Sequence, residues 1–273
     1  RSRPMTQFCN LHSHTLGSYL DALIRIPDLF EHSAKLGAKA VAITDHGTLN
    51  QAWNAFKIYR QYKESGKPMK LILGNEIYFC EDLADKKSKR RHLVLLAANE
   101  IGYKNLLRIT AAGFENPAIA IGRTFPRVDA EMLRKYNEGL FATSACGGSI
   151  IAAHIFKGDR VAALKAAQIF KDIFGDRFFI ELQPHTLARG DYNQEFLNQQ
   201  IKSVAEELGI EMVATCDSHY LTAAHEKYHD MILAISSKKA LDDPDRHRYA
   251  SFEPCIVCRG TGVSSEGSTE VCY

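Results

Sequence analysis

The sequence predicts one α/β domain folded as a distorted seven-stranded (β/α)7 barrel, followed by a short cysteine-rich C-terminal extension. Two observations carry this prediction. Seven short apolar runs alternate with helical patterns, and histidines or carboxylates follow several of these runs directly. Strands buried on both faces read as continuous apolar runs, and repeated strand–helix alternation is typical of a parallel sheet. With 273 residues the chain is long enough for one such barrel.

The predicted strands are 8–11, 40–44, 70–73 with 77–79, 92–97, 139–144, 177–182 and 211–215. Three helices have clear signals at their ends. Pro27 and Asp28 begin one that ends at Gly37. The other two carry apolar stripes that we expect to face the core; these are Leu49, Ala52, Trp53, Phe56 and Tyr59 before Gly66, and Phe196, Leu197, Ile201, Val204 and Leu208 before Gly209.

The composition limits the functional classes. The 34 Lys and Arg residues nearly balance 32 Asp and Glu residues, so nucleic-acid contact would need a local basic patch. No apolar run approaches the roughly 20 residues of a membrane span, and the first residues do not resemble a signal peptide. An odd number of cysteines, seven, favours thiols or metal ligands over a disulfide framework. We therefore expect a cytoplasmic protein that is not bound to a membrane.

Residues of metal-ligand type gather at the predicted strand ends. His12 and His14 lie two residues apart, so that their side chains point to the same side of an extended segment. The same chemistry recurs at Asp21, Asp45, His46, Glu76, His92, Asp217 and His219. The pair alone is compatible with two surface histidines, and each of the others alone with a turn or a solvated charge. Together they indicate a centre for Zn, Mn or Fe. Several carboxylates suggest more than one ion, because carboxylate oxygens can bridge two metals.

These motifs resemble the PHP (polymerase and histidinol phosphatase) family, and within it the N-terminal domain of bacterial DNA polymerase III alpha subunits. The resemblance runs from about Phe8 to Tyr249. It is carried by His-Ser-His at 12–14 with Tyr-Leu-Asp at 19–21, Ile-Thr-Asp-His-Gly at 43–47, Leu-Gly-Asn-Glu at 73–76, His-Leu-Val-Leu at 92–95, Arg-Val-Asp at 127–129, Thr-Ser-Ala-Cys at 143–146, Cys-Asp-Ser-His at 216–219 and Leu-Asp-Asp-Pro at 241–244. The last motif favours the polymerase branch.

The resemblance implies a PHP-type metal-dependent phosphoesterase domain at 5–251 that binds three divalent transition-metal ions. It implies nine ligands: His12, His14, Asp21, His46, Glu76, His92, Cys146, Asp217 and His219. We predict catalytic roles for Asp45, His46 and Asp217, although Asp45 is also a candidate for orienting a ligand. Ala22, Thr15-Leu16-Gly17 and Cys216 depart from the usual pattern of the polymerase branch, but none of them removes a ligand.

The implied function is removal of a 3'-terminal nucleotide from DNA, as part of a replicative polymerase or replisome. The basic residues Lys86, Lys87, Lys89, Arg90 and Arg91 could hold the phosphates of the strand, or could simply form a solvated loop. Two alternatives stay open: a stand-alone phosphatase for small phosphate esters, and a non-catalytic scaffold stabilised by metals. The catalytic aspartates of a polymerase palm are absent from the sequence, so this chain alone should not polymerise DNA.

The tail at 252–273 differs in composition, with Gly, Ser and Thr around Cys255, Cys258 and Cys272. The stretch 255–262 resembles one half of the zinc repeats of J-type chaperones. A structural zinc site needs four ligands, so we predict a truncated zinc-binding module that a cysteine beyond Tyr273 would complete. The alternative is a tail with three incidental cysteines.

Overall fold

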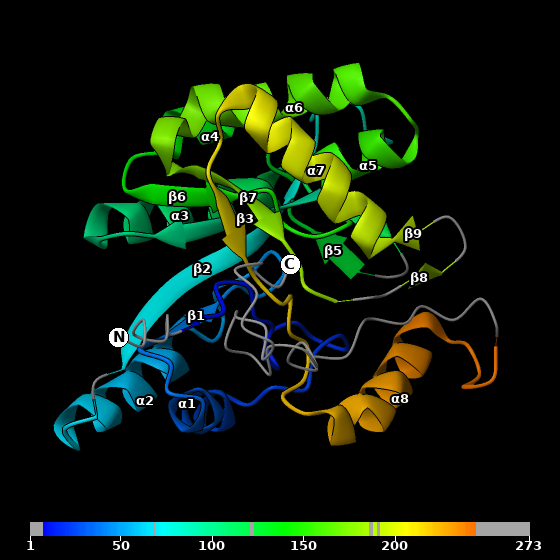
Figure 1. The fold of residues 1–273 in the computed structure, drawn as a ribbon. Coiled ribbons are helices and arrows are strands. Elements are labelled where there is room, and N and C mark those ends of the chain that lie inside the picture. Colours follow the sequence, from blue (N-terminus) through cyan, green and yellow to red (C-terminus); the bar gives the residue numbers. More distant parts are fainter. Residues whose placement is uncertain (1–7, 68, 121–122, 186–187, 190–191, 244–273) are drawn as a thin grey trace, which may run out of the picture.

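A curled six-stranded sheet forms the centre of the protein, with the strand order β1-β2-β3-β6-β7-β10 (Figure 1). The structure is a computed structural model that describes residues 8–67, 69–120, 123–185, 188–189 and 192–243. The sheet strands are β1 (Ala40–Ile43), β2 (Lys70–Phe79), β3 (Arg91–Ala97), β6 (Leu140–Thr143), β7 (Phe178–Leu182) and β10 (Met212–Ala214). Two small hairpins pair β4 (Ala118–Ala120) with β5 (Arg123–Phe125) and β8 (Ala188–Arg189) with β9 (Tyr192–Asn193).

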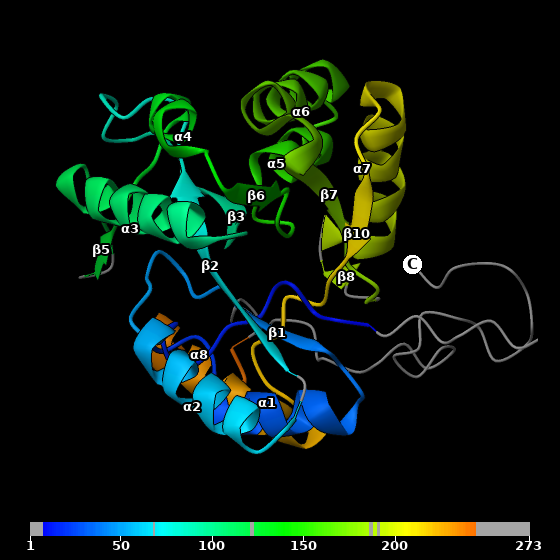
Figure 2. The same cartoon turned by 90° about the vertical axis from the view of Figure 1, so that its left-hand side faces the viewer.

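Helices cover the sheet in two groups, which Figures 1 and 2 show on opposite sides. The larger group is α3 (Glu100–Glu115), α4 (Ala130–Tyr136), α5 (Ile150–Phe156), α6 (Arg160–Phe174) and α7 (Gln194–Leu208). The smaller group is α1 (Ile26–Lys35), α2 (Ala52–Glu64) and α8 (Glu226–Ser237). Short 3-10 helices precede β7 (Gly175–Arg177) and α8 (Ala223–His225). Among the described residues no helix is both long and apolar enough to cross a membrane.

The prediction of an all-parallel sheet is wrong at one strand. β1 and β2 run parallel, as do β6, β7 and β10, but β3 is antiparallel to both of its neighbours, β2 and β6. The cause is the connection between β2 and β3, which is a short charged loop at 80–90. A parallel return needs a crossover of a dozen or more residues, usually a helix, whereas a short loop allows an antiparallel return.

The predicted first strand, 8–11, does not form, so the sheet has six strands and not seven. Its place is taken by isolated bridges further along. Ser13 pairs with Ser218, and the Thr44 amide donates to the Ser13 carbonyl at 2.9 Å. The side chain of Asn10 accounts for the lost ladder, because it donates to the His12 carbonyl and accepts from the Cys216 amide, both at 2.9 Å.

The two apolar runs at 70–73 and 77–79 belong to one continuous strand, β2. The polar residues between them interrupt the apolar pattern but stay in the ladder. Asn75 and Glu76 are both fully buried, and Asn75 donates to Thr110 Oγ1 at 2.9 Å. A carboxylate in the middle of a buried strand requires partners, and the site described below provides them.

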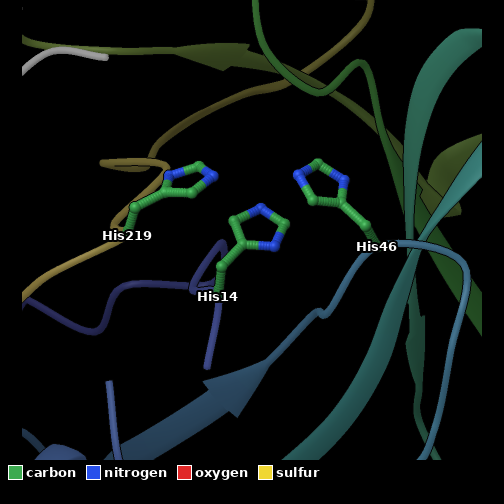
Figure 3. Close-up of side chains that lie close together, drawn as sticks. All are labelled: His14, His46 and His219. Carbon is green, nitrogen blue, oxygen red and sulfur yellow. The ribbon is translucent and has the colours of Figure 1, made fainter. Parts of the chain in front are cut away.

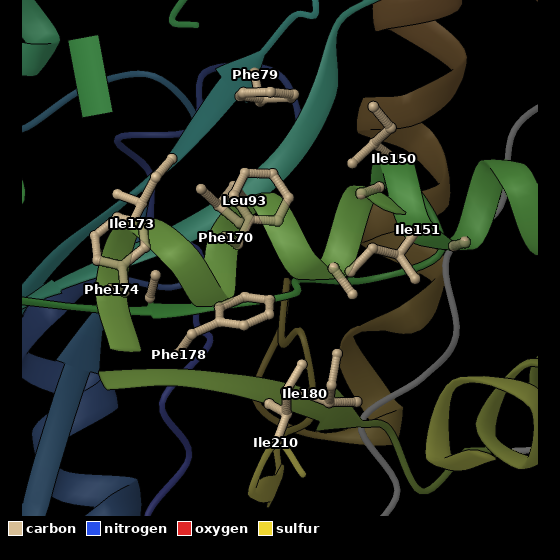
Figure 4. Close-up of a cluster of buried hydrophobic side chains, with 14 of the residues drawn as sticks. Phe79, Leu93, Ile150, Ile151, Phe170, Ile173, Phe174, Phe178, Ile180 and Ile210 are labelled. Atoms are coloured by element: carbon tan, nitrogen blue, oxygen red, sulfur yellow. The ribbon is translucent and has the colours of Figure 1, made fainter. Parts of the chain in front are cut away.

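Two apolar cores hold the helix groups to the sheet. The larger core lies under α3–α7, where Phe170 packs edge-on against Phe79 at 5.0 Å between ring centroids and tilted against Phe178 at 5.5 Å (Figure 4). The smaller core joins α1 and α2 to β1 through residues such as Phe30 and Val41. The larger core includes Ile77 and Leu93, the neighbours of Glu76 and His92 in β2 and β3, so these two site residues stand on well-packed strands.

The helix-end predictions for α1 and α7 are confirmed, with Pro27 in the first turn of α1 and Gly209 in a left-handed conformation (φ 61°) after α7. The prediction that the apolar stripes face the core is wrong for their largest members. Trp53 is 67% exposed, and Phe56 and Phe196 are also exposed. In α2 the buried positions are occupied by small alanines, Ala52 and Ala55, so the aromatic side chains lie on the outer face.

Candidate metal centre

Glu76 is the middle of the site, because its carboxylate lies among four imidazoles. Oε1 is 3.3 Å from His12 Nε2 and 3.0 Å from His92 Nδ1. Oε2 is 3.3 Å from His14 Nε2 and 2.7 Å from His46 Nδ1. The side chains of Glu76, His12 and His14 are fully buried. Each oxygen of this carboxylate thus lies close to a different pair of histidines, an arrangement suited to bridging two cations.

Two aspartates extend the centre toward His219. Oδ1 of Asp217 lies 3.2 Å from Nε2 of both His12 and His14 and 3.7 Å from His219 Nδ1. Oδ2 of Asp21 lies 2.9 Å from His46 Nε2 and 3.3 Å from His219 Nε2. These contacts connect residues from the two ends of the chain into a single cluster.

Three overlapping groups in this cluster have atoms close enough to hold an ion. They are His14, His46 and His219; His12, His14 and Glu76; and His46, Glu76 and His92. Figure 3 shows the first group, with the ring of His14 between the other two. Its centroid lies 4.1 Å from that of His46 and 4.4 Å from that of His219, and both pairs are stacked.

The topology explains why these residues meet. His46 follows β1, Cys146 follows β6, and Asp217 and His219 follow β10, so all four lie beyond the C-terminal ends of parallel strands. His92 is the second residue of β3. Because β3 runs in the opposite direction, its beginning lies at the same edge as the ends of its neighbours. The structure therefore brings these residues together at one edge of the sheet, and His92 reaches that edge from the start of its strand.

Backbone strain concentrates at this centre. Among the described residues four non-glycine residues have positive φ, and three of them are Asp217 itself (47°), Leu20 (56°) beside Asp21, and Ala145 (57°) beside Cys146. Left-handed backbone is unfavourable for most L-residues and persists where surrounding structure enforces it, often at functional sites. Here the left-handed residues lie at or directly before Asp21, Cys146 and Asp217, where they set the direction of the backbone that carries these side chains.

Cys146 lies at the edge of the cluster, next to His92. Its Sγ is 3.4 Å from His92 Nδ1 and 3.8 Å from Glu76 Oε1. Burial raises the pKa of the thiol well above its ordinary value, and the charges of Asp217 and Glu76 raise it further. Gly148 allows His92 to lie this close to the chain, because a Cβ at position 148 would be only 2.8 Å from His92 Nδ1.

The buried donor atoms are better arranged to bind metal ions than to form hydrogen bonds with one another. Glu76 Oε2 and His46 Nδ1 are buried and only 2.7 Å apart, but their angles are not those of a good hydrogen bond, and Oδ2 of Asp21 and Oδ1 of Asp217 likewise lack a well-aligned partner. Buried polar atoms are normally hydrogen-bonded. Burial opposes charge, but nearby histidines hold the pKa values of Glu76 and Asp21 well below their usual range. Carboxylate oxygens and imidazole nitrogens gathered in one buried cluster are the donor set of a transition-metal site.

A carboxylate that the sequence reasoning missed lies behind His12. Oε2 of Glu181, in β7, is 2.9 Å from His12 Nδ1 and accepts from Thr215 Oγ1 at 2.5 Å, while Oε1 accepts from Thr143. Donation from Nδ1–H to Glu181 directs Nε2 of His12 toward the centre, where it can bind a metal once it has lost its proton. The available signal was a single carboxylate inside the apolar run 177–182.

A second outer contact fixes His14. Nδ1 of His14 lies 3.1 Å from Ser18 Oγ, and the Ser18 hydroxyl donates to Asp45 Oδ1 at 2.8 Å. Asp45 also accepts from the amide and hydroxyl of Thr15, each at 2.6 Å. The carboxylate is buried with its oxygens occupied, so its position fits orientation of His14 rather than substrate contact. His46 and Asp217, the other predicted catalytic residues, are partly exposed and lie in the cluster.

Two other predicted sites are the basic residues at 86–91 and the cysteine-rich tail. The basic residues at 86–91 are in the loop between β2 and β3 and at the start of β3. The tail with Cys255, Cys258 and Cys272, and the end of the motif at 241–244, lie outside the described residues. Cys9, Cys80 and Cys146 are free thiols.

Comparison with known proteins identifies the family of this chain. The family model of the PHP domain matches residues 10–185. The chain belongs to the PHP family. This PHP domain is 37% identical over 260 residues to a DNA polymerase III subunit alpha from Thermus aquaticus, and 34% identical over 255 residues to one from Borreliella burgdorferi. Each alignment covers 91% of this chain but only about a fifth of the relative, 20% and 21% respectively.

Among solved structures, the PHP domain is similar to an amidohydrolase from Chromobacterium violaceum. The TM-score is 0.45 and the identity 12%, over 78% of this chain and 87% of the other.

Proposed function

We propose that this PHP domain is a metal-dependent phosphoesterase that removes nucleotides from the 3' end of single-stranded DNA. One observation carries the proposal: nine side chains of ligand type, Glu76 among them, come from both ends of the chain and form one cluster. A scaffold without bound ions would have to bury these anions and imidazoles with poor hydrogen bonding, which is costly.

His12, His14, Asp21, His46, Glu76, His92, Cys146, Asp217 and His219 would hold the ions, which we propose to be three Zn, Mn or Fe. When bound, such ions activate water and offset negative charge on phosphoryl oxygens. The exposed side of the centre is where substrate would approach. His92, Asp21, His46 and Asp217 retain 23%, 18%, 11% and 11% side-chain exposure, whereas Glu76 and His12 retain none.

The other groups of the chain hold the ligands in position. We assign Asp45 to this role, acting through Ser18 on His14, in place of direct catalysis. Glu181 does the same for His12. Ser18 can serve two neighbours because its oxygen also accepts from the His46 amide at 3.1 Å. Fixing the tautomers in this way keeps Nε2 of both histidines directed at the centre.

The context that we propose is the N-terminal part of a cytoplasmic replicative polymerase, with the PHP domain at 5–251 and a zinc-binding tail after it. The relatives named DNA polymerase III subunit alpha support this context. The net charge of the chain is only +2, so it contributes little to attraction of DNA.

The test is hydrolysis of a 3'-labelled single-stranded oligonucleotide beside a phosphate monoester, with the metal-stripped protein and Zn, Mn or Fe returned one at a time. Release of the labelled nucleotide with a returned metal supports the proposal. Activity on the monoester alone would identify a small-molecule phosphatase. Metal binding that raises thermal stability without hydrolysis of either substrate would identify a scaffold.

A further inference from the structure

Next to the metal centre lies an aromatic wall made of Tyr78 and Phe125. The Tyr78 ring is stacked on His46 at 5.9 Å between centroids and lies edge-on to His92 at 5.6 Å. Phe125 is perpendicular to Tyr78 at 5.3 Å. Backbone bonds fix this arrangement, because the Val128 amide donates to the Tyr78 carbonyl at 3.0 Å and brings the end of β5 to β2.

The wall ends at Arg90, whose guanidinium carbon lies over the Phe125 ring at 4.1 Å from its centroid. In the part of the chain that the structure describes, no carboxylate is within ion-pairing distance of this guanidinium. Stacking uses the flat face of the group, so the N–H donors in its plane remain available. An arginine that is held in place without an anion is suited to bind one from outside.

Strand geometry separates Arg90 from the other cations of the loop. Side chains two residues apart share a face of a strand, which places Glu76 with Tyr78 on β2. Arg90 directly precedes β3, and its stacking on Phe125 brings it to the wall that includes Tyr78. Tyr78 and His92 are direct partners across the two strands. Arg91 pairs with Phe79, a core residue, and therefore belongs to the opposite face. Lys86 and Lys87 lie in the exposed part of the loop.

We propose that Arg90, held by Phe125, binds the phosphate next to the scissile one and so makes the centre select a polynucleotide over a single phosphate ester. This inference rests on the proposed phosphoesterase function and names the residue that determines its substrate class. Planar guanidinium groups recognise phosphate oxygens through paired hydrogen bonds, which a mobile lysine in the same loop does not reproduce.

The experiment compares the unchanged protein with Arg90→Gln, Phe125→Leu and the matched control Lys87→Gln from the same loop. Two metal-loaded assays are run, one with a single-stranded oligonucleotide and one with the p-nitrophenyl ester of thymidine 5'-phosphate, which carries a single phosphate. Arg90→Gln should raise KM for the oligonucleotide about tenfold, equal to about 1.4 kcal/mol, with kcat unchanged. The single-phosphate ester should be unaffected. Phe125→Leu should act in the same direction but less, and Lys87→Gln should change little.

A binding measurement separates failure of this inference from failure of the proposed function. Fluorescence anisotropy of a labelled oligonucleotide needs no hydrolysis, and Arg90→Gln should reduce the slope of log Kd against log salt by about 0.7, the value for one contact to a single strand. Equal effects of Arg90→Gln and Lys87→Gln would overturn the role of Arg90, as would an equal rise in KM for both substrates. If the unchanged protein hydrolyses neither substrate, the proposed function fails, and the anisotropy comparison still decides whether Arg90 holds a phosphate.

Discussion

His12 and Glu181 form a buried pair, with Nδ1 of the imidazole 2.9 Å from Oε2 of the carboxylate. Substitution Glu181→Gln should weaken metal binding by about 10- to 100-fold, because an amide holds the imidazole less firmly and lowers its basicity. Metal titration measured by competition with a chelator checks this. Glu207→Gln is the matched control, since Glu207 pairs with Arg160 at the surface and should leave metal affinity unchanged. Equal affinity in the two variants would contradict the role assigned to Glu181.

Elemental analysis of the reconstituted protein should find about three transition-metal ions per chain, as the three overlapping ligand groups suggest. Glu76→Gln should lower this number by more than one, because the carboxylate lies in two of the three groups and contacts four imidazoles. A protein that holds no Zn, Mn or Fe after reconstitution would refute the metal centre.

Asp217→Asn and His14→Ala should each reduce hydrolysis on the order of 100-fold or more, in the range seen for loss of one stabilising group. The fold should persist. Asparagine tolerates the left-handed backbone of position 217, where φ is 47°, and both residues lie outside the two apolar cores. Circular dichroism and thermal unfolding in the presence of a chelator measure the fold without the contribution of bound metal. Loss of activity only together with global unfolding would argue against a functional role.

Metal affinity should increase with pH through the neutral range. In the metal-free protein, burial lowers the pKa of His12, but Asp217, Glu181 and Glu76 outweigh it and raise the pKa well above the ordinary value; burial raises that of Cys146. Both groups therefore carry protons near neutral pH, which a metal must displace, so acid weakens binding. Calorimetry in buffers with different ionisation enthalpies should detect proton release, and Cys146→Ser should release fewer protons. A pH-independent affinity would contradict this reasoning.

The sequence by itself determined the chemistry of the centre and much of the chain path. Each short ligand motif is a local property, as are the proline in the first turn of α1 and the glycine after α7, because each depends on residues close together along the chain. The apolar runs also located the six sheet strands, since burial on both faces leaves a visible pattern.

Only the tertiary structure decided how the strands pair and which side chains bond to the candidate ligands from outside the centre. β3 lies between β2 and β6 and is antiparallel to both, and β6 is more than 40 residues away from it in sequence. Asn10 accepts from the Cys216 amide, 206 positions away, where the first strand was expected. Glu181 meets His12 across 169 positions, and Phe125 meets Arg90 and Tyr78 through the bridge between 79 and 128. Such contacts have no local pattern, because they are selected by packing in three dimensions and not by neighbours along the chain.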